Sequence, residues 1–262
     1  MIMRTKWMTV LFLICAGIFS TGNAWAQNFD ELWKKVDEAS KLNLPQTVLK
    51  LTEEIFRKGE KEKELPQMLK AAVWRMSYRQ GLTPDSLYAD VNKLEQWLKQ
   101  SEQPMEKAIL HSLLAETYAE FAVNNRWTLR QRTEVAGELP EDMRVWTAGQ
   151  FVEKVRQHAC AAVKDSVLLL NTSSGNYKPL VVQGNASGYY HHDMYHLLAM
   201  RGITALRQME ELDKSKRVTK EIETLYECMI SAYKEKGNDE GVLLSKLPFL
   251  EWKYGPQSGY RP

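Results

Sequence analysis

Three of the five histidines of this chain lie close together, in the run YYHHDMYH from Tyr189 to His196. His192 and His196 are four residues apart, a spacing that directs two imidazoles to one side of a helix, as in the H-E-x-x-H motif of zinc proteases. Asp193 stands where that motif has its catalytic Glu, and its shorter carboxylate would not reach a metal-bound water. No third ligand follows at a diagnostic spacing, and on a helical wheel both histidines point away from the apolar face. We therefore assign no metal site, and keep a metal-dependent hydrolase using His192 and His196 as the alternative function.

A second candidate is the run RWTLRQR from Arg126 to Arg132, which places three guanidinium groups beside an indole. This combination can hold phosphates and stack on bases. Four acidic residues follow closely and can neutralise the arginines, namely Glu134, Glu138, Glu141 and Asp142. We interpret the run as a locally salt-bridged connection and not as a nucleic-acid site.

The sequence contains no other pattern typical of an active site. It has no G-x-S-x-G nucleophile elbow, no phosphate-binding loop, no dinucleotide fingerprint and no C-x-x-C pair. Helical spacing places Cys160 beside the apolar face of its helix and Cys228 well away from the apolar face of its own helix. Whether the two cysteines form a disulfide is left open. We expect a protein that is not an enzyme, with no catalytic residue, no bound metal and no cofactor.

The N-terminus has the three parts of a secretory signal. Arg4 and Lys6 precede an apolar run from Met8 to Phe19, and small residues at Ala24 and Ala26 form a cleavage site. Residues 1–26 are therefore predicted to be a signal peptide that is removed on export. The location that follows is the periplasm or the cell envelope.

The balance of charge and hydropathy excludes two classes of partner. Without residues 1–26 the chain loses two of its 35 basic and none of its 33 acidic residues, so the mature chain is formally neutral. A neutral chain has no overall attraction for nucleic acid or anionic lipid. The apolar run near the N-terminus is too short to cross a ~30 Å hydrocarbon core, and no longer one follows. We expect no nucleic-acid partner and no stable membrane span.

Apolar residues that recur every three or four positions predict five helices in the first half of the chain. Asn28 is a candidate N-cap of the first, and Pro45 suits the first turn of the second. Gly81 is a candidate left-handed residue at the end of the third, and Thr83-Pro84 a candidate start of the fourth. The fifth is predicted to begin at Pro104.

The second half begins with a polar connection over residues 124–140 and a long helix predicted from Pro140 to Leu170. An irregular segment follows from Asn171 to Gly188, which we expect to be the most mobile internal part. Within this segment the stretch from Pro179 to Val182 has the composition of a short strand.

The remaining helices are predicted from Tyr190 to Met209, from Val218 to Tyr233, and from Asp239 to about Trp252. Gly237 is expected to end the second of these, and Pro248 to bend or end the third. Residues 254–262 are rich in Gly and Pro and are predicted to form a flexible tail.

The predicted fold is therefore all-α. Helices of similar length with short links cannot each bury an apolar face alone, so we expect stacked antiparallel helix pairs in a TPR-like or α-superhelical bundle. The helical domain is predicted to span residues 27–253, with possible halves at 27–124 and 140–253.

Several stretches together resemble the N-terminal helical region of large bacterial alpha-2-macroglobulin-like proteins. The similarity covers most of the mature chain. It is carried by NFDELWKKV at residues 28–36, LPQTV at 44–48, PQMLKA at 66–71, DSVLLLNTS at 165–173, and the Tyr189–Ala199 segment.

The resemblance implies an envelope protein related to protease traps, which use β-domains, a bait segment and sometimes a thioester. This sequence ends at Pro262 before any β-domain, and neither Cys160 nor Cys228 lies in the C-x-E-Q form that a thioester requires. No inhibitory residue is carried over. We expect a non-catalytic, exported interaction module whose partner is another protein or the remainder of a macroglobulin-like chain. The sequence leaves open whether it is complete or a fragment, and its oligomeric state.

Overall fold

The computed structural model describes residues 21–83, 86–134, 137–185 and 187–255, and the backbone alone for residues 21–28. Throughout these residues the chain forms helices joined by turns and loops, with no β-strand. The prediction of an all-α fold is confirmed. No helix in the described part is both long enough and apolar enough to cross a membrane.

The chain divides into two compact units at residue 84. The sequence placed its possible halves on either side of residues 124–140, but the helices that flank this connection pack against each other. The 124–140 connection therefore lies inside the second unit. The division between units falls at the fourth predicted helix start, where Pro84 and Asp85 lie outside the described residues.

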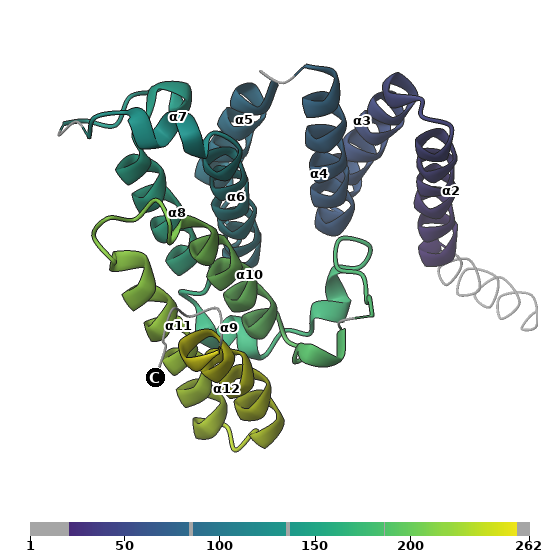
Figure 1. The fold of residues 1–262 in the computed structure, drawn as a ribbon. Coiled ribbons are helices and arrows are strands. Elements are labelled where there is room, and N and C mark those ends of the chain that lie inside the picture. Colours follow the sequence, from purple (N-terminus) through teal and green to yellow (C-terminus); the bar gives the residue numbers. More distant parts are fainter. Residues whose placement is uncertain (1–20, 84–85, 135–136, 186, 256–262) are drawn as a thin grey trace, which may run out of the picture. The chain divides into compact units, whose positions relative to one another are not determined.

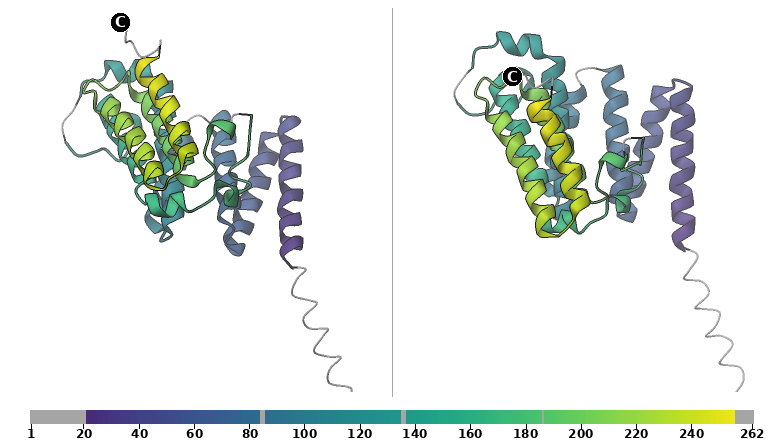
Figure 2. Two further views of the ribbon diagram at one scale, coloured as in Figure 1. Left: turned by 90° about the horizontal axis from the view of Figure 1, so that it is seen from below. Right: turned by 60° about the horizontal axis from the view of Figure 1, so that its bottom comes forward.

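The first unit consists of α2 (Thr21–Lys41), α3 (Pro45–Glu62) and α4 (Leu65–Leu82), which lie side by side in Figures 1 and 2. The indole of Trp33 in α2 donates to Gln67 in α4 at 2.7 Å, and the hydroxyl of Tyr78 in α4 donates to Ser40 in α2 at 2.6 Å. Both helices therefore run in the same direction, and α3 runs opposite to them.

The core of the first unit forms where these three helices meet. It is made of the apolar positions that recur along each helix, namely Phe29, Leu32, Trp33, Val36, Ala39, Val48, Ile55 and Ala71. The rings of Trp33 and Trp74 meet edge to face with their centroids 5.9 Å apart. The predicted three-to-four periodicity thus identified the buried faces of α2 and α3, but not that of α4, where Leu69 and Ala71 are buried and Val73 is exposed.

The helix ends in this unit were predicted less well. Pro45 begins α3 as expected, because a missing N–H costs nothing in the first turn. Asn28 lies inside α2 and does not cap it, and Gly81 lies inside α4 and not in a left-handed terminal position. The left-handed residues described in this unit are instead Asn43, at φ 51° between α2 and α3, and Lys63, at φ 59°, which lets α3 turn directly into α4.

The second unit is a larger set of helices. Consecutive long helices run antiparallel, as shown by Tyr118 of α6 bonding Glu95 of α5, and by Phe121 of α6 stacking on Phe151 of α8. The helices are α5 (Ser86–Gln100), α6 (Pro104–Asn124), α7 (Arg126–Gln131), α8 (Ala148–Ala162), α9 (Ser166–Leu170), α10 (Met194–Met209), α11 (Arg217–Glu235) and α12 (Asp239–Tyr254).

The centre of the second unit is the contact among α6, α8 and α10. Gly202 allows α10 to approach α8 closely, because an added Cβ would lie 3.4 Å from the Cβ of Ala159. Around this contact α5, α11 and α12 extend the packing, with α11 against both α10 and α12. Figure 1 shows α11 and α12 beside α10 in the lower part of this unit.

The long helix predicted from Pro140 to Leu170 is wrong, because three shorter elements replace it. A single 3-10 turn covers Met143–Val145, and α8 begins after Thr147, which forms a reciprocal capping box with Gln150. The chain breaks again before α9, whose first turn is capped by Asp165. The apolar residues do recur at helical spacing across this region. The capping side chains nevertheless interrupt the helix, and apolar periodicity alone does not indicate these breaks.

The irregular segment from Asn171 to Gly188 is present in the described residues, with short 3-10 turns at Ser174–Tyr177 and Ser187–Tyr189. The stretch from Pro179 to Val182, considered as a possible strand, forms none, and Pro179, Leu180 and Val181 lie in turns and a bend. The start of the segment is fixed by backbone hydrogen bonds between residues 172–174 and residues 192–194.

At the C-terminal end, Gly237 adopts φ 64° and ends α11 as predicted. Pro248 does not end α12, which continues through it to Tyr254. Of the predicted tail, Tyr254 belongs to this helix and residues 256–262 lie outside the described residues.

Candidate functional site

The segment from Tyr189 to His196 is mostly not helical. Helix α10 begins at Met194, and Asp193 is its N-cap, with its Oδ1 accepting a hydrogen bond from the backbone N–H of His196 at 2.8 Å. His192 therefore precedes the helix. His192 and His196 therefore do not point to the same side of one helix, as the sequence spacing had suggested, because the helix starts between them.

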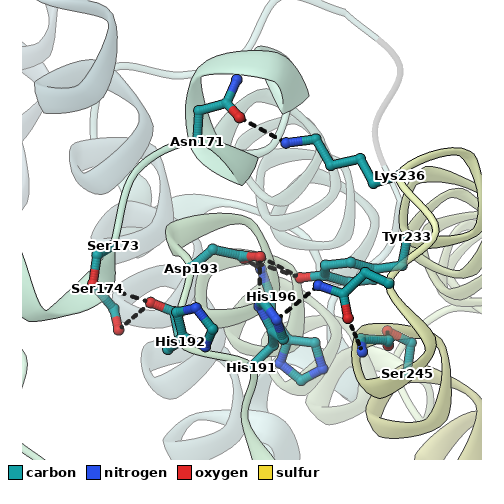
Figure 3. Close-up of polar contacts among 12 residues, drawn as sticks. Asn171, Ser173, Ser174, His191, His192, Asp193, His196, Tyr233, Lys236 and Ser245 are labelled. Atoms are coloured by element: carbon teal, nitrogen blue, oxygen red, sulfur yellow. Dashed lines mark hydrogen bonds and ion pairs between the residues drawn. The ribbon is translucent and has the colours of Figure 1, made fainter.

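Asp193 is the centre of a buried polar network, shown in Figure 3. Its carboxylate accepts hydrogen bonds from the Tyr233 hydroxyl at 2.9 Å and pairs with Nδ1 of His191 at 2.7 Å. Burial and the adjacent carboxylate raise the pKa of Tyr233 far above its ordinary value, so this hydroxyl remains a donor. The network joins the start of α10 to the end of α11.

The hydrogen bonds of His191 fix its tautomer and exclude it as a general base. The side-chain oxygen of Asn238 accepts from the N–H of Gly241 at the start of α12, so its amide nitrogen faces Nε2 of His191 as a donor. Nε2 therefore accepts, and Nδ1 carries the hydrogen that goes to Asp193. With both nitrogens engaged in this way, the ring has no lone pair left to take a proton from a substrate.

His196 is fully buried, contrary to the wheel that placed it away from the apolar face. Neither ring nitrogen has a hydrogen bond of good geometry. Burial lowers the pKa of His196 to about 4, although the charge of Asp193 and the backbone of Leu244 both favour the protonated ring. The carbonyl of Leu244 lacks its usual helical donor, because Pro248 has no N–H.

The two histidines of the proposed metal site thus lie in different environments. His192 is exposed and its ring stacks on His191, with centroids 4.2 Å apart, whereas His196 is buried beneath Tyr190. Among the described residues no group of three or more His, Cys, Asp or Glu side chains is arranged to hold a metal ion. The geometry therefore provides no support for the hydrolase alternative.

The other two histidines, which the sequence analysis did not single out, meet inside the second unit. Nδ1 of His111 on α6 lies 2.9 Å from Nδ1 of His158 on α8, and Nε2 of His158 lies 3.3 Å from a carboxylate oxygen of Glu95 on α5. Nε2 of His158 donates to Glu95, and a hydrogen bond whose direction is set by the two tautomers joins the Nδ1 atoms of His158 and His111. A carboxylate, a buried imidazole and a half-buried imidazole then form a chain of hydrogen bonds.

Neighbouring side chains set the charge of this second network. Burial alone would raise the pKa of Glu95, but hydrogen bonds from His158 and Tyr118 and the charge of Lys154 outweigh it and lower the pKa to about 2. Burial, and after it the charge of His158, lower the pKa of His111 to about 4. Glu95 is therefore an anion and His111 a neutral base at pH 7. No nucleophilic side chain is hydrogen-bonded to His111, so the chain of bonds supplies no complete catalytic group.

The arginine run is salt-bridged, as the sequence analysis proposed, but with a different partner. Arg126 and Arg130 of α7 both bind Glu211, which follows α10, at 2.9 and 3.0 Å. Arg132 donates to the backbone carbonyl of Trp146 at 2.6 Å. The partner that sequence proximity suggested, Glu134, instead accepts from the N–H of Gly149 in the first turn of α8.

Cys160 and Cys228 are both free thiols. Cys160 donates to Glu221 at 2.9 Å, and burial followed by this contact raises its pKa to about 12. Cys228 is exposed. The question that the sequence left open is therefore answered in favour of two unpaired cysteines, with Cys160 poorly suited to act as a nucleophile.

The second unit contains a groove between α10 and α12, which both pack against α11. Its volume is about 1140 Å³. One face of α11 lines it with Thr219, Glu223 and Tyr226, and α10 and α12 add Thr204 and Trp252 among others. We call this the α10–α12 groove.

The groove combines apolar and charged groups. Burial raises the pKa of Glu210, which also receives a hydrogen bond from Trp252. Lys253 is paired with Glu223 across the groove wall. Charged and polar side chains form most of the lining, with apolar surface from Met200, Pro248 and Trp252, and no histidine or cysteine lines it.

Comparison with protein-family models gives no match. Searches of curated proteins and of solved structures likewise give no significant match. The functional argument therefore depends on the residues and their geometry.

Proposed function

We propose that this chain is an exported, non-catalytic module of the cell envelope that binds another polypeptide, in a TPR-like stack of antiparallel helix pairs. In this proposal it corresponds to the N-terminal helical region of a macroglobulin-like protein. The partner is a separate protein or the remainder of such a chain. The observation that carries the proposal is the α10–α12 groove.

The size of the groove supports a polypeptide ligand. Small-molecule pockets occupy about 300–1,000 Å³ and bury most of their ligand. At about 1140 Å³, with α10, α11 and α12 all contributing to its lining, the groove exceeds that range. Helix arrays commonly use such concave surfaces to hold an extended or helical segment of another protein.

The chemistry of the groove fits binding better than catalysis. The partly exposed Trp252 provides aromatic surface, a residue type that contributes strongly to binding energy in protein interfaces. Catalysis would require a nucleophile, a base or a metal in a defined arrangement. The two histidine networks that could supply a base lie elsewhere, and in the first of them both nitrogens of His191 are already engaged.

A matched pair of threonines tests the proposal. Thr204 lines the groove, whereas Thr224 lies on an exposed part of α11 that is not part of it. Each donates its hydroxyl to the carbonyl four residues earlier, so a substitution costs the same local bond at either position. We would replace each in turn by a photo-crosslinking amino acid in cells that export the protein.

Crosslinking of a defined polypeptide from position 204 and not from position 224 is the expected result. Equal labelling from both positions, or no adduct from any of positions 204, 219 and 251, would contradict the proposal. The relation to macroglobulins has its own test in the coding sequence after Pro262, where an in-frame continuation into β-rich domains is expected.

A further inference from the structure

Helix α12 carries an apolar stripe on the side that faces away from the rest of the second unit. Leu243, Leu247, Leu250 and Tyr254 are 55%, 56%, 40% and 58% exposed. The opposite side of the helix is covered by α11, with the rings of Phe249 and Trp252 near that of Tyr226. The stripe is therefore an outer surface of the helix and not part of its packing against α11.

The spacing of the stripe is that of a two-stranded coiled coil. Its members are separated by four, three and four residues, which is the alternation of a and d positions in a heptad. Isolated exposed apolar residues are normal on a protein surface, but a contiguous row of large ones marks an interaction site. The register of this row specifies a helix as its partner.

The two edges of the stripe have opposite charge. Glu251 lies at an e position on one edge, and Lys246 and Lys253 lie at g positions on the other. Lys253 pairs with Glu223 of α11, whereas Lys246 and Glu251 form no salt bridge with another described residue. Lys246 and Glu251 are five residues apart, the separation of the g and e positions that pair between parallel helices.

We propose that α12 pairs with α12 of a second copy of this chain, in a parallel arrangement about a two-fold axis. In that arrangement the acidic edge of each helix faces the basic edge of the other, so Lys246 of one copy meets Glu251 of the other twice. In an antiparallel pair like edges face each other, and Lys246 would meet Lys253. The charge pattern therefore selects both the partner and its direction.

The stripe is short, which sets the strength of the pairing. Stable interfaces bury about 1,200–2,000 Å² in total, and a few turns of helix bury less. The pairing is consequently a reversible one that forms at micromolar or higher concentration. It is an isologous contact, so it closes on itself and does not propagate into filaments.

Sedimentation velocity of the purified exported chain over a range of concentrations tests the pairing. The wild-type chain is expected to show a concentration-dependent dimer, and Leu247→Glu to remain a monomer. The matched control is Val167→Glu, which changes a residue that is 69% exposed on α9 outside the stripe. Circular dichroism confirms that each variant retains its helices. A wild-type chain that stays monomeric at every concentration, or a Val167→Glu variant equally defective, would overturn the proposal.

Charge exchange tests the direction. Lys246→Glu and Glu251→Lys should each weaken self-association about tenfold, and an equimolar mixture of the two should associate more tightly than either alone. The mixture restores both opposite-charge contacts that each variant by itself has lost. If Lys246→Glu instead strengthens association, the helices pair antiparallel and the proposed geometry is wrong.

The apolar stripe lies outside the polypeptide-binding groove, although Glu251 on its edge also lines the groove, so the two proposals are separated at Thr204 and Leu247. A photo-crosslinker at Thr204 should give the same adduct in the Leu247→Glu variant as in the wild-type sequence. Loss of dimerisation with retained crosslinking, or the reverse, therefore distinguishes failure of one proposal from failure of the other.

Discussion

The two histidine networks of the second unit differ in how their members are brought together. His191, Asp193 and His196 are near neighbours in the sequence, and one turn of chain plus Tyr233 completes their network. His111 and His158 are 47 residues apart and meet only because α6 and α8 pack antiparallel. The cluster around Asp193, which stood out in the sequence, has its polar groups fixed by structural contacts. The pair of His111 and His158 did not stand out in the sequence, and its His111 ring is only half-buried.

This difference shows that proximity in sequence is a weak indicator of function for histidine. In the first network Asp193 is already used as an N-cap and as the acceptor for Tyr233, so the carboxylate serves the fold. In the second, Glu95 faces a pair of imidazoles whose outer member is only half-buried. The following experiments measure how far the two networks differ, beginning with the largest expected effect.

Asp193→Ala is expected to destabilise the protein most. The change removes the cap of α10 and leaves the buried Tyr233 hydroxyl and the His191 ring without their acceptor. We expect a loss of about 3 kcal/mol or more in the free energy of unfolding, measured by chemical denaturation. Asp165→Ala is the matched control, since Asp165 caps α9 but is exposed, and it should cost about 1 kcal/mol. Equal costs for the two changes would show that the network adds nothing to the cap.

Glu95→Ala tests the second network. It removes the acceptor of the Tyr118 hydroxyl and of the His158 ring, and we expect a loss of about 2 kcal/mol. The exposed Glu120 on α6 provides the control, and its change to Ala should stay within about 0.5 kcal/mol. A cost for Glu95→Ala that exceeds the cost for Asp193→Ala would reverse the comparison and make the inconspicuous network the more important one for stability.

The dependence of stability on pH should involve both networks in the same direction. The pKa values of His196 and His111 are lowered from 6.5 to about 4 in the folded protein, so the unfolded chain binds more protons between these values. Stability is therefore fully present above about pH 6.5 and falls as the pH decreases towards 4. Glu95, with its pKa lowered from 4.5 to about 2, adds a further loss below pH 4.5.

His196→Leu and His111→Leu separate the two contributions. Each should reduce the slope of unfolding free energy against pH between 6.5 and 4 by up to about one proton. The larger reduction is expected for His196, because it is fully buried whereas His111 is partly exposed. If neither variant changes the slope, then neither ring gains a proton when the protein unfolds.

His192→Ala should have the smallest effect. The ring is exposed, so the change is expected to alter the free energy of unfolding by less than about 0.5 kcal/mol. Zinc content measured by metal analysis should be substoichiometric and the same in the wild-type and variant proteins. Stoichiometric zinc that disappears in the variant would restore the hydrolase alternative.

Much of the fold was determined by the sequence itself. Recurrence of apolar residues at three and four positions identified α3, α6 and α11 and their buried faces, because burial along one helix follows directly from local spacing. Prolines at the starts of α3 and α6 were also correctly placed, since the preference for Pro in the first turn depends only on the local backbone.

The tertiary structure alone decided which polar side chains meet. Arg126 and Arg130 pair with Glu211 and not with the acidic residues nearest in sequence, and Glu95 reaches His158 from another helix. Pro248 remains inside α12 within a helix anchored on α11. A polar contact of this kind depends on the packing and direction of helices that are distant in the chain, and apolar periodicity specifies only which face is buried, not what lies against it.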